Sequence, residues 1–388
     1  MNKIVVTGGA GFIGQTLIGK LIADTRASLV VIDNFSPQIH GTSPSLAKVF
    51  SSSRVTVIRQ DISEEGEWLK QLSDANALVH LAAETGTGQS MYEIAKYTQV
   101  NIAGTALILD WLANNKNQIS NLVLASSRSV YGEGLYSCNQ CREYLTPEPR
   151  ANEQLSEGKY EQFCASCGTQ LRPIGTPETS PLKPASIYAA TKQSQETLFD
   201  IFARSSKMKA NILRFQNVYG EGQSLKNPYT GILSIWANLM RQNLDVSIFE
   251  DGLESRDFIH VTDVVNAIYL SLTKSKYGVN YYNVGSGAQT TVSRIGHLLK
   301  EYLNSNSKLV VTGEYRIGDI RHNYADLTNI EEELGFSPEI NLEQGLQLFC
   351  DWVLKNEIET STIERANAEL KNRNLMGISH EFDNTIKT

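Results

Sequence analysis

The sequence lacks the features that would indicate a membrane protein, a secreted scaffold or a nucleic-acid-binding protein. No apolar run reaches the roughly 18 residues needed to cross a bilayer. The start, Met1-Asn2-Lys3, leads directly into a strand pattern and shows no signal peptide. The 35 Lys and Arg are outnumbered by 42 Asp and Glu, and the net charge of −7 disfavours an extended grip on nucleic acid or anionic lipid. We therefore expect a soluble, cytoplasmic protein with no nucleic-acid partner and no membrane partner.

Cysteine is also scarce. The five cysteines are an odd number, which disfavours a disulfide framework. The 388 residues are 41% hydrophobic and 20% charged, a balance that can fill a core and that excludes intrinsic disorder over most of the length. This length favours two domains, or one large domain with an addition.

Strand and helix patterns alternate through the first half of the chain. Helical periodicity is clearest over residues 91–115 and 188–204. The strands read as unbroken apolar runs, which is typical of a parallel sheet covered by helices on both faces. We therefore expect an α/β fold built on a Rossmann-type, doubly wound parallel sheet. The predicted strands span residues 3–7, 29–33, 55–58, 77–80, 121–125 and 210–215.

A glycine-rich turn, Thr7–Gly14, follows the first strand. Its Gly8, Gly11 and Gly14 would allow a tight turn, close approach to a pyrophosphate and close helix packing. The N-terminus of the next helix would add N–H groups and partial positive charge. Three glycines alone could form a plain turn, but Asp33 follows 19 residues after Gly14, at the end of the second strand. The pattern therefore predicts a dinucleotide site.

Asp33 also indicates which dinucleotide binds. Its carboxylate can accept hydrogen bonds from the adenosine ribose and would repel a 2′-phosphate. Because Asn34 and Phe35 supply no arginine to neutralise such a phosphate, NAD is favoured over NADP. Asp61, which precedes Ile62 after the third strand, could contact the adenine or only cap a helix.

Tyr188 and Lys192 stand four residues apart, on one face of a predicted helix. A free tyrosine, with a pKa of about 10, is a poor base at neutral pH, but a nearby cation favours the phenolate. The pair could then take a proton from a substrate hydroxyl while a hydride leaves for NAD. The serines of Ser126–Gly132 follow the fifth strand, at the edge where parallel sheets place their chemistry. An exposed helix face and a capped turn are the alternative interpretations.

Together these segments, with His80–Ala83, resemble the extended short-chain dehydrogenase/reductase family, and within it the nucleotide-sugar epimerase/dehydratase branch. The likeness covers residues 1–355 apart from a cysteine-containing segment. It implies that Tyr188 is the base, that Lys192 positions the nicotinamide ribose and that Ser127 contacts the sugar oxygen. The cofactor-binding residues that it implies are Gly8, Gly11, Phe12, Ile13, Gly14, Asp33, Asn34, Asp61, Ile62, Leu81, Ala82, Ala83, Asn101, Tyr188 and Lys192.

Later segments resemble the nucleotide-sugar contacts of this branch. Asn217 matches an asparagine that meets the sugar diphosphate, and Arg256 matches an arginine that pairs with a phosphate. Guanidinium forks suit a diphosphate because they offer bidentate hydrogen bonds, although surface salt bridges are the alternative. The substrate-binding residues that the resemblance implies are Thr85, Thr87, Ser127, Arg128, Ser129, Asn217, Arg256, Arg316 and Asp319.

The two residues after Ser127 bear on the reaction. The 4,6-dehydratases of this branch carry an Asp-Glu pair there, whereas this chain has Arg128 and Ser129, so 4,6-dehydration is disfavoured. What remains is NAD-dependent epimerisation of a nucleotide-diphosphate sugar, expected at C4 through a 4-keto intermediate. The alternatives are a nucleotide-sugar dehydrogenase or reductase with net redox turnover, and a non-catalytic zinc-ribbon binding module.

Residues 134–180 interrupt the alternating pattern and contain two C-x-x-C pairs. Such pairs can present four thiolates tetrahedrally to a structural zinc ion, although redox disulfides and merely buried thiols are alternatives. We therefore predict a zinc-ribbon-like insertion near the substrate mouth. Together with His80–Tyr92, it resembles the dTDP-L-rhamnose 4-epimerases, which implies a dTDP-6-deoxyhexose substrate such as dTDP-L-rhamnose. The predicted zinc ligands are Cys138, Cys141, Cys164 and Cys167.

The expected organisation has three parts. Residues 1–221 form the NAD-binding domain with its insertion. Residues 222–355 form mainly a nucleotide-sugar-binding lobe, from which part of 258–284 returns to the first domain. Residues 356–388 form a C-terminal tail, expected to be a peripheral helix with a frayed end. The resemblance also implies a homodimer.

Overall fold

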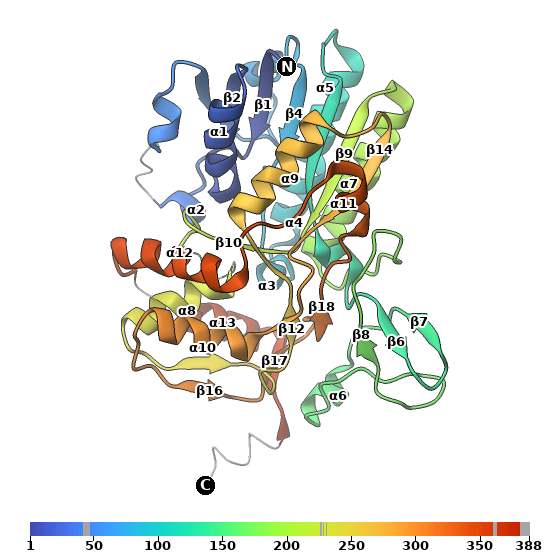
Figure 1. Ribbon diagram of the computed structural model, residues 1–388, viewed down its shortest axis with the longest axis vertical. Coiled ribbons are helices and arrows are strands. Elements are labelled where there is room, and N and C mark those ends of the chain that lie inside the picture. The colour runs from blue at the N-terminus through green and yellow to red at the C-terminus, as the bar shows by residue number, and fades with distance from the viewer. Residues whose placement is uncertain (42–46, 226, 228, 230, 360–362, 381–388) are drawn as a thin grey trace.

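A seven-stranded parallel sheet lies at the centre of the computed structural model (Figure 1). Its strand order is β14-β9-β5-β4-β1-β2-β3, so the order reverses between β1 and β4, where such sheets open a crevice at the carboxyl ends of their strands. The structure describes residues 1–41, 47–225, 227, 229, 231–359 and 363–380. The strands are β1 (Lys3–Thr7), β2 (Ser28–Asp33), β3 (Val55–Arg59), β4 (Ala77–His80), β5 (Asn121–Ser127), β9 (Lys209–Phe215) and β14 (Val279–Val284).

Helices cover both faces of this sheet. Alternate residues of β1 point to opposite sides: Ile4 and Val6 belong to one core, and Val5 belongs to the other. This confirms the reading of the apolar runs as strands with two buried faces. The first core is closed by α1 (Phe12–Asp24), α9 (Val261–Thr273) and α11 (Thr328–Leu334), and the second by α5 (Gly104–Asn114) and α7 (Ile187–Ser206).

A second lobe has its own core, in which Trp236, Ile295 and Phe349 are buried. These residues come from α8 (Ile232–Arg241), α10 (Val292–Tyr302) and α12 (Leu342–Lys355). Four small sheets accompany these helices or join the lobe to its surroundings. They pair β10 (Asn217–Tyr219) with β13 (Phe258–His260), β11 (Val246–Ile248) with β16 (Leu309–Val311), β12 (Ser255–Arg256) with β15 (Thr290–Thr291) and β18 (His322–Asn323), and β17 (Glu314–Arg316) with β19 (Met376–Ile378).

The insertion projects beside this lobe, at the lower right of Figure 1. It contains a three-stranded antiparallel sheet and the short helix α6 (Asn152–Ser156). Its strands are β6 (Tyr136–Cys138), β7 (Glu143–Leu145) and β8 (Arg172–Pro173). The small core of this sheet includes Tyr136, Cys138, Cys164 and Leu171.

The C-terminal segment contains more structure than its polar sequence predicted. A helix, α13 (Ile363–Asn372), is followed by β19, which pairs antiparallel with β17. The predicted frayed end at residues 381–388 lies outside the described residues. In the described parts of the chain, no helix combines the length and apolarity needed to span a bilayer. The predicted domain boundaries stay a prediction.

Candidate active site

A cavity of about 450 Å³ opens at the carboxyl ends of β1, β2, β4, β5 and β9, and this volume lies in the range typical of small-molecule sites. It brings together most of the residues that the sequence pointed to. The predicted residues that line it are Gly8, Gly11, Phe12, Ile13, Gly14, Asp33, Asn34, Asp61, Ile62, Leu81, Ala82, Ala83, Thr85, Thr87, Ser127, Arg128, Ser129, Tyr188, Lys192 and Asn217.

The glycine turn forms one wall because larger residues do not fit there. Gly8 has a φ of +68°, and a Cβ at this position would lie 2.6 Å from the backbone nitrogen of Ala82. A Cβ on Gly14 would lie 2.5 Å from the Cα of Gly9, so α1 can pack closely against the turn. Helix α1 begins at Phe12, and its first three residues line the cavity. The turn therefore has the close backbone approach that a pyrophosphate site needs.

Asp33 ends β2 beside this turn and is only 8% exposed. Its carboxylate accepts hydrogen bonds from the backbone nitrogens of Ala10 at 3.0 Å and Phe35 at 2.9 Å. These bonds fix the carboxylate in the cavity wall, where remaining lone pairs can accept from ribose hydroxyls. Asn34 donates to Asp61 at 2.8 Å, so the ends of β2 and β3 are tied together.

Tyr188, Lys192 and Ser127 lie where α7 crosses the end of β5. Ser186 caps the helix by accepting from the backbone nitrogen of Ala189 at 3.2 Å. The backbone nitrogen of Tyr188 donates to the Ser90 hydroxyl at 3.0 Å. Lys192 Nζ donates to the Ala125 carbonyl at 2.8 Å. One capped helix thus presents the phenol and the ammonium to the same cavity.

The electrostatic setting of this pair is unusual. Burial lowers the pKa of Lys192 to about 7, while the Glu196 charge acts in the opposite direction. Burial also raises the pKa of the Tyr188 phenol, with the Ser127 side chain and the Arg128 charge opposing that shift. Perturbed titratable groups that meet in a cavity are typical of catalytic sites.

A buried ion pair stands behind the catalytic candidates. Arg214 on β9 donates to both oxygens of Glu196 on α7, at 3.0 and 2.8 Å. Ser126 donates to the same carboxylate at 2.5 Å, and Arg214 also donates to the Tyr131 hydroxyl at 2.9 Å. Because Ser126 precedes Ser127, this network fixes α7, β5 and β9 at the level of the cavity.

His80, at the end of β4, is 1% exposed and lies in a hydrogen-bonded network. Its Nδ1 meets the Thr7 hydroxyl at 2.7 Å, and its Nε2 meets the Thr105 hydroxyl at 3.0 Å. Burial, together with the nearby Lys192 charge, lowers the pKa of His80 to about 3. The imidazole is therefore neutral at physiological pH and holds β4 to β1 and α5.

This shift predicts a pH dependence of stability. An unfolded histidine, with a pKa of about 6.5, binds a proton that folded His80 does not bind between pH 6.5 and 3. Above pH 6.5 this histidine does not change the free energy of unfolding. Below pH 6.5 it lowers that free energy by at most about 1.4 kcal/mol per pH unit. Chemical denaturation at pH 7, 6 and 5 should show a smaller slope in His80→Gln than in the wild type. His297→Gln, at an exposed histidine, should leave the slope unchanged.

Several predicted residues lie outside the cavity lining. Among the described residues, Asn101, Arg256, Arg316 and Asp319 do not border it. Asn101 is fully buried and donates to Thr191 at 2.9 Å, which ties it to α7. Arg256 donates through its two Nη atoms to Asp319 at 2.8 Å and to three backbone carbonyls.

Arg128 links these groups to the cavity. It lines the cavity and donates through Nε to Asn217 at 3.2 Å. Burial, followed by the charge of Arg256, lowers the pKa of Arg128 to about 10. Against the effect of desolvation, the charges of Arg256, Arg316, Arg128 and Arg150 lower the pKa of the Asp319 carboxyl group. Four guanidinium groups therefore act on one carboxylate.

The four predicted cysteine ligands come together in the insertion. One sulfur atom from each of Cys138, Cys141, Cys164 and Cys167 lies within 4.8 Å of the others. Cys138 Sγ is 3.5 Å from Cys167 Sγ, and Cys141 Sγ is 3.8 Å from Cys164 Sγ. Four thiols at this spacing suit a tetrahedral metal site. Cys350 is buried apart from them, in the core of the second lobe.

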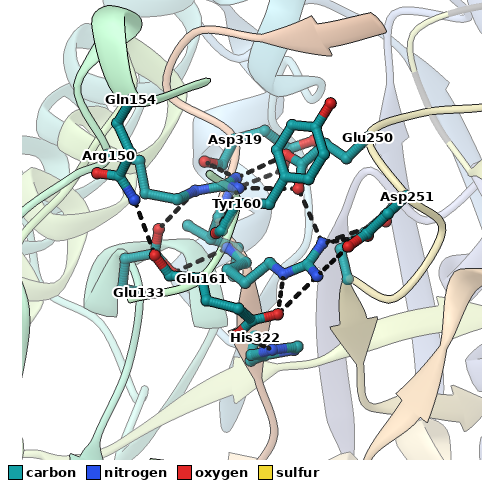
Figure 2. Close-up of polar contacts among 12 residues, drawn as sticks. Glu133, Arg150, Gln154, Tyr160, Glu161, Glu250, Asp251, Asp319 and His322 are labelled. Carbon is teal, nitrogen blue, oxygen red and sulfur yellow. Dashed lines mark hydrogen bonds and ion pairs between the residues drawn. The ribbon is translucent and has the colours of Figure 1, made fainter. Parts of the chain in front are cut away.

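A buried charge network joins the insertion to the second lobe (Figure 2). Arg150, whose side chain is fully buried, donates to Glu250 at 2.8 Å and to the Asp319 carbonyl at 3.1 Å. Arg321, also fully buried, pairs with Glu161 of the insertion at 2.6 Å and with Asp251 at 2.7 Å. The insertion is therefore anchored next to the Arg256–Asp319 pair.

Sequence reasoning missed some cavity residues. Glu84 lines the cavity, and the Ser90 hydroxyl accepts a hydrogen bond from the Tyr188 backbone nitrogen; both residues lie within His80–Tyr92, the segment that carries part of the family resemblance. His40 and Tyr229 also line the cavity. His40 Nε2 lies 3.6 Å from Asp33 Oδ1. No spacing in the sequence pointed to these two residues.

Comparison with known proteins adds family evidence to this geometry. The model of the NAD dependent epimerase/dehydratase family matches residues 163–285. The model of the 3-beta hydroxysteroid dehydrogenase/isomerase family matches residues 5–219. Over 355 residues the chain is 35% identical to the dTDP-L-rhamnose 4-epimerase of Burkholderia thailandensis, an alignment that covers 91% of this chain and 95% of that protein.

Solved structures agree with these matches. The UDP-glucose 4-epimerase of Thermotoga maritima, solved with UDP-glucose, is similar with a TM-score of 0.71 and 28% identity, over 91% of this chain and 99% of that one. MoeE5, solved in complex with UDP-glucuronic acid and NAD, is similar with a TM-score of 0.70 and 25% identity, with the same coverage of both chains.

Proposed function

Because the chain belongs to the extended short-chain dehydrogenase/reductase family, in its NAD-dependent epimerase/dehydratase branch, we propose that it is an NAD-dependent nucleotide-sugar 4-epimerase. The observation that carries this proposal is the meeting of Tyr188, Lys192 and Ser127 in one cavity with the glycine turn. The positions after Ser127 hold Arg128 and Ser129, so the carboxylate pair expected of a 4,6-dehydratase is missing there. The favoured substrate is a dTDP-6-deoxyhexose such as dTDP-L-rhamnose.

The residues of the cavity fit NAD. The Gly8 turn leaves no space for a Cβ, which suits a backbone that lies against a pyrophosphate. The Asp33 carboxylate would accept from the ribose hydroxyls and disfavour a 2′-phosphate, while Lys192 would hold the nicotinamide ribose. When bound, NAD supplies the hydride acceptor and donor, and its positive charge favours the Tyr188 phenolate.

The chain itself supplies proton transfer and positioning. Tyr188 would take the proton of the sugar C4 hydroxyl and later return it, with the C4 hydride removed from one face and restored on the other. The Ser127 hydroxyl would hold the C4 oxygen by a hydrogen bond. The Arg128 guanidinium, beside Asn217, would bind oxygens at the diphosphate end of the substrate. Such a reaction is redox-neutral over the whole cycle.

Proton NMR of dTDP-L-rhamnose with the enzyme and trace NAD tests the proposed activity. We expect a new anomeric signal with altered H4 couplings, which identifies the C4 epimer, and no accumulation of NADH at 340 nm. Stoichiometric NADH would favour the dehydrogenase alternative. An unchanged spectrum with dTDP-, UDP-, GDP- and CDP-sugars would reject the epimerase proposal.

We further propose that Cys138, Cys141, Cys164 and Cys167 hold a structural zinc ion. The four sulfurs converge, and the odd fifth residue, Cys350, lies elsewhere. Metal analysis of the purified protein should give about one zinc per chain. The Cys138→Ser/Cys164→Ser double variant should lose it, whereas Cys350→Ser should keep it. Equal zinc content in all three proteins would contradict the site. The cytoplasmic location and the homodimer stay predictions.

A further inference from the structure

The C-terminal segment is tied to the lobe that borders the cavity. Arg241 on α8 donates to the Asn356 carbonyl at 2.6 Å. Asn238 on the same helix donates to the Glu359 carbonyl at 2.6 Å and accepts from the Glu359 nitrogen at 3.0 Å. Because Ile232 and Leu233 at the start of α8 line the cavity, the chain leaves α12 along an element of the site.

Helix α13 (Ile363–Asn372) then contacts a residue of the cavity wall. Glu369 accepts hydrogen bonds from the hydroxyls of Tyr92 at 2.9 Å and Tyr229 at 3.0 Å. Tyr92 and Tyr229 are also bonded to each other at 3.0 Å, and Tyr229 lines the cavity. One carboxylate of the C-terminal helix therefore holds a side chain of the wall.

A second contact reaches the wall through the loop after β4. Leu370 is 3% exposed, and its methyl carbon lies 3.5 Å from the position that a Cβ on Gly88 would take. Gly88 follows Thr87, a lining residue, at the start of α3 (Thr87–Ser90). Gly86, which also lines the cavity, approaches Tyr229, because a Cβ there would lie 3.0 Å from the Tyr229 carbonyl. Leu370 of α13 and Tyr229 therefore pack against the same loop after β4.

The same segment also holds Arg316. Strand β19 pairs with β17 so that Met376 stands opposite Arg316, and Asn367 on α13 accepts from Arg316 Nη2 at 3.0 Å. The guanidinium lies 4.8 Å from the centre of the Phe249 ring. Its buried Nε has no hydrogen-bond partner among the described residues. A half-buried guanidinium whose buried Nε is an unused donor is suited to an anionic ligand.

We propose that α13 and β19 are part of the substrate site, in which Asn367 positions Arg316 and Glu369 positions Tyr229 against a bound nucleoside diphosphate. The ligand class rests on the proposed function. The positive charge of Arg316 adds to that of Arg128 and Arg256, with Asp319 as their shared carboxylate. The polar tail is thus a binding element. Asn367 acts through Arg316, and Glu369 acts through Tyr229.

Binding and turnover of four variants test this proposal. Asn367→Ala and Glu369→Ala should each weaken the Kd for dTDP or UDP, measured by calorimetry, about tenfold, because a hydrogen bond to a charged group is lost. KM for the sugar substrate should rise to a similar extent with kcat within about twofold. The Kd for NAD should not change. Glu369→Gln, which keeps an acceptor oxygen, should restore most of the affinity, and Ala368→Ser, exposed on the same helix, should match the wild type.

The outcomes separate this inference from the proposed activity. Wild-type affinity for dTDP and UDP in both alanine variants would overturn it. Equal losses of nucleotide and NAD affinity with a lowered melting temperature would also overturn it, because they would show a purely structural role. A wild-type protein that binds neither dTDP nor UDP would also overturn the inference. If the alanine variants lose affinity for nucleoside diphosphates but not for NAD, and no sugar is epimerised, the inference holds and the epimerase proposal fails.

Discussion

Replacing Tyr188 by Phe should lower kcat about 10³-fold, because in the proposed mechanism the phenol moves the proton of the reacting hydroxyl. The substitution removes one oxygen and leaves the ring, which packs edge-on against Tyr97 with centroids 6.5 Å apart. The Kd for NAD and the KM for the sugar nucleotide should change by less than about threefold. Steady-state kinetics and calorimetry on the variant check these values.

Tyr97→Phe is the matched control for this experiment. Its hydroxyl donates to the carbonyls of Thr85 at 2.6 Å and Gly86 at 3.0 Å, so it supports the cavity loop without taking part in proton transfer. It should alter KM more than kcat. A Tyr188→Phe variant with more than a tenth of wild-type kcat would contradict the role of Tyr188 as the base.

Replacing Arg150 by Met should destabilise the junction between the insertion and the second lobe by about 3–5 kcal/mol. Arg150 is fully buried and lies 2.8 Å from Glu250 and 3.4 Å from Glu133 (Figure 2). Its removal leaves two buried carboxylates without this partner, and methionine cannot neutralise them. Urea denaturation followed by tryptophan fluorescence should show the loss, since Trp236 and Trp352 report on the second lobe.

Arg172→Met provides the comparison, because Arg172 is an exposed arginine of the same insertion. It should change the free energy of unfolding by no more than about 0.5 kcal/mol. Hydrogen exchange should become faster in Arg150→Met around Glu133 and Asp319, whose carbonyl Arg150 binds. Indistinguishable stabilities of the two variants would show that the network does not hold the insertion.

The central fold was predictable from the sequence because its signals are local. Strand β1 was predicted at its observed bounds, and the other five predicted strands of the central sheet match within two residues at either end, since unbroken apolar runs can be buried on both faces only in such a sheet. The glycine turn and Asp33 line one cavity, as predicted, because local sequence patterns also marked these residues. The family resemblance drawn from these motifs is confirmed by the matched relatives.

Contacts between distant segments were not predictable in this way. Arg150 and Glu250 are a hundred residues apart in the sequence, and no pattern in the sequence around either residue predicts that it is buried. The polar tail predicted a peripheral helix, yet Glu369 accepts a hydrogen bond from Tyr229, which lines the cavity, and Asn367 accepts one from Arg316. Arg256 matched a phosphate-binding position, but the structure shows its donors bonded to Asp319 and to backbone carbonyls. Which residues pair across a long sequence separation depends on how the whole chain packs, and a single sequence does not show that packing.

Redox-neutral inversion at C4 is measured by NMR of dTDP-L-rhamnose that carries deuterium at C4. If the enzyme is a 4-epimerase, the product should be the C4 epimer with the deuterium retained at C4 and with no reduced nicotinamide released into solution. Deuterium in released reduced NAD, or a substrate that is recovered unchanged, would contradict redox-neutral epimerisation at C4.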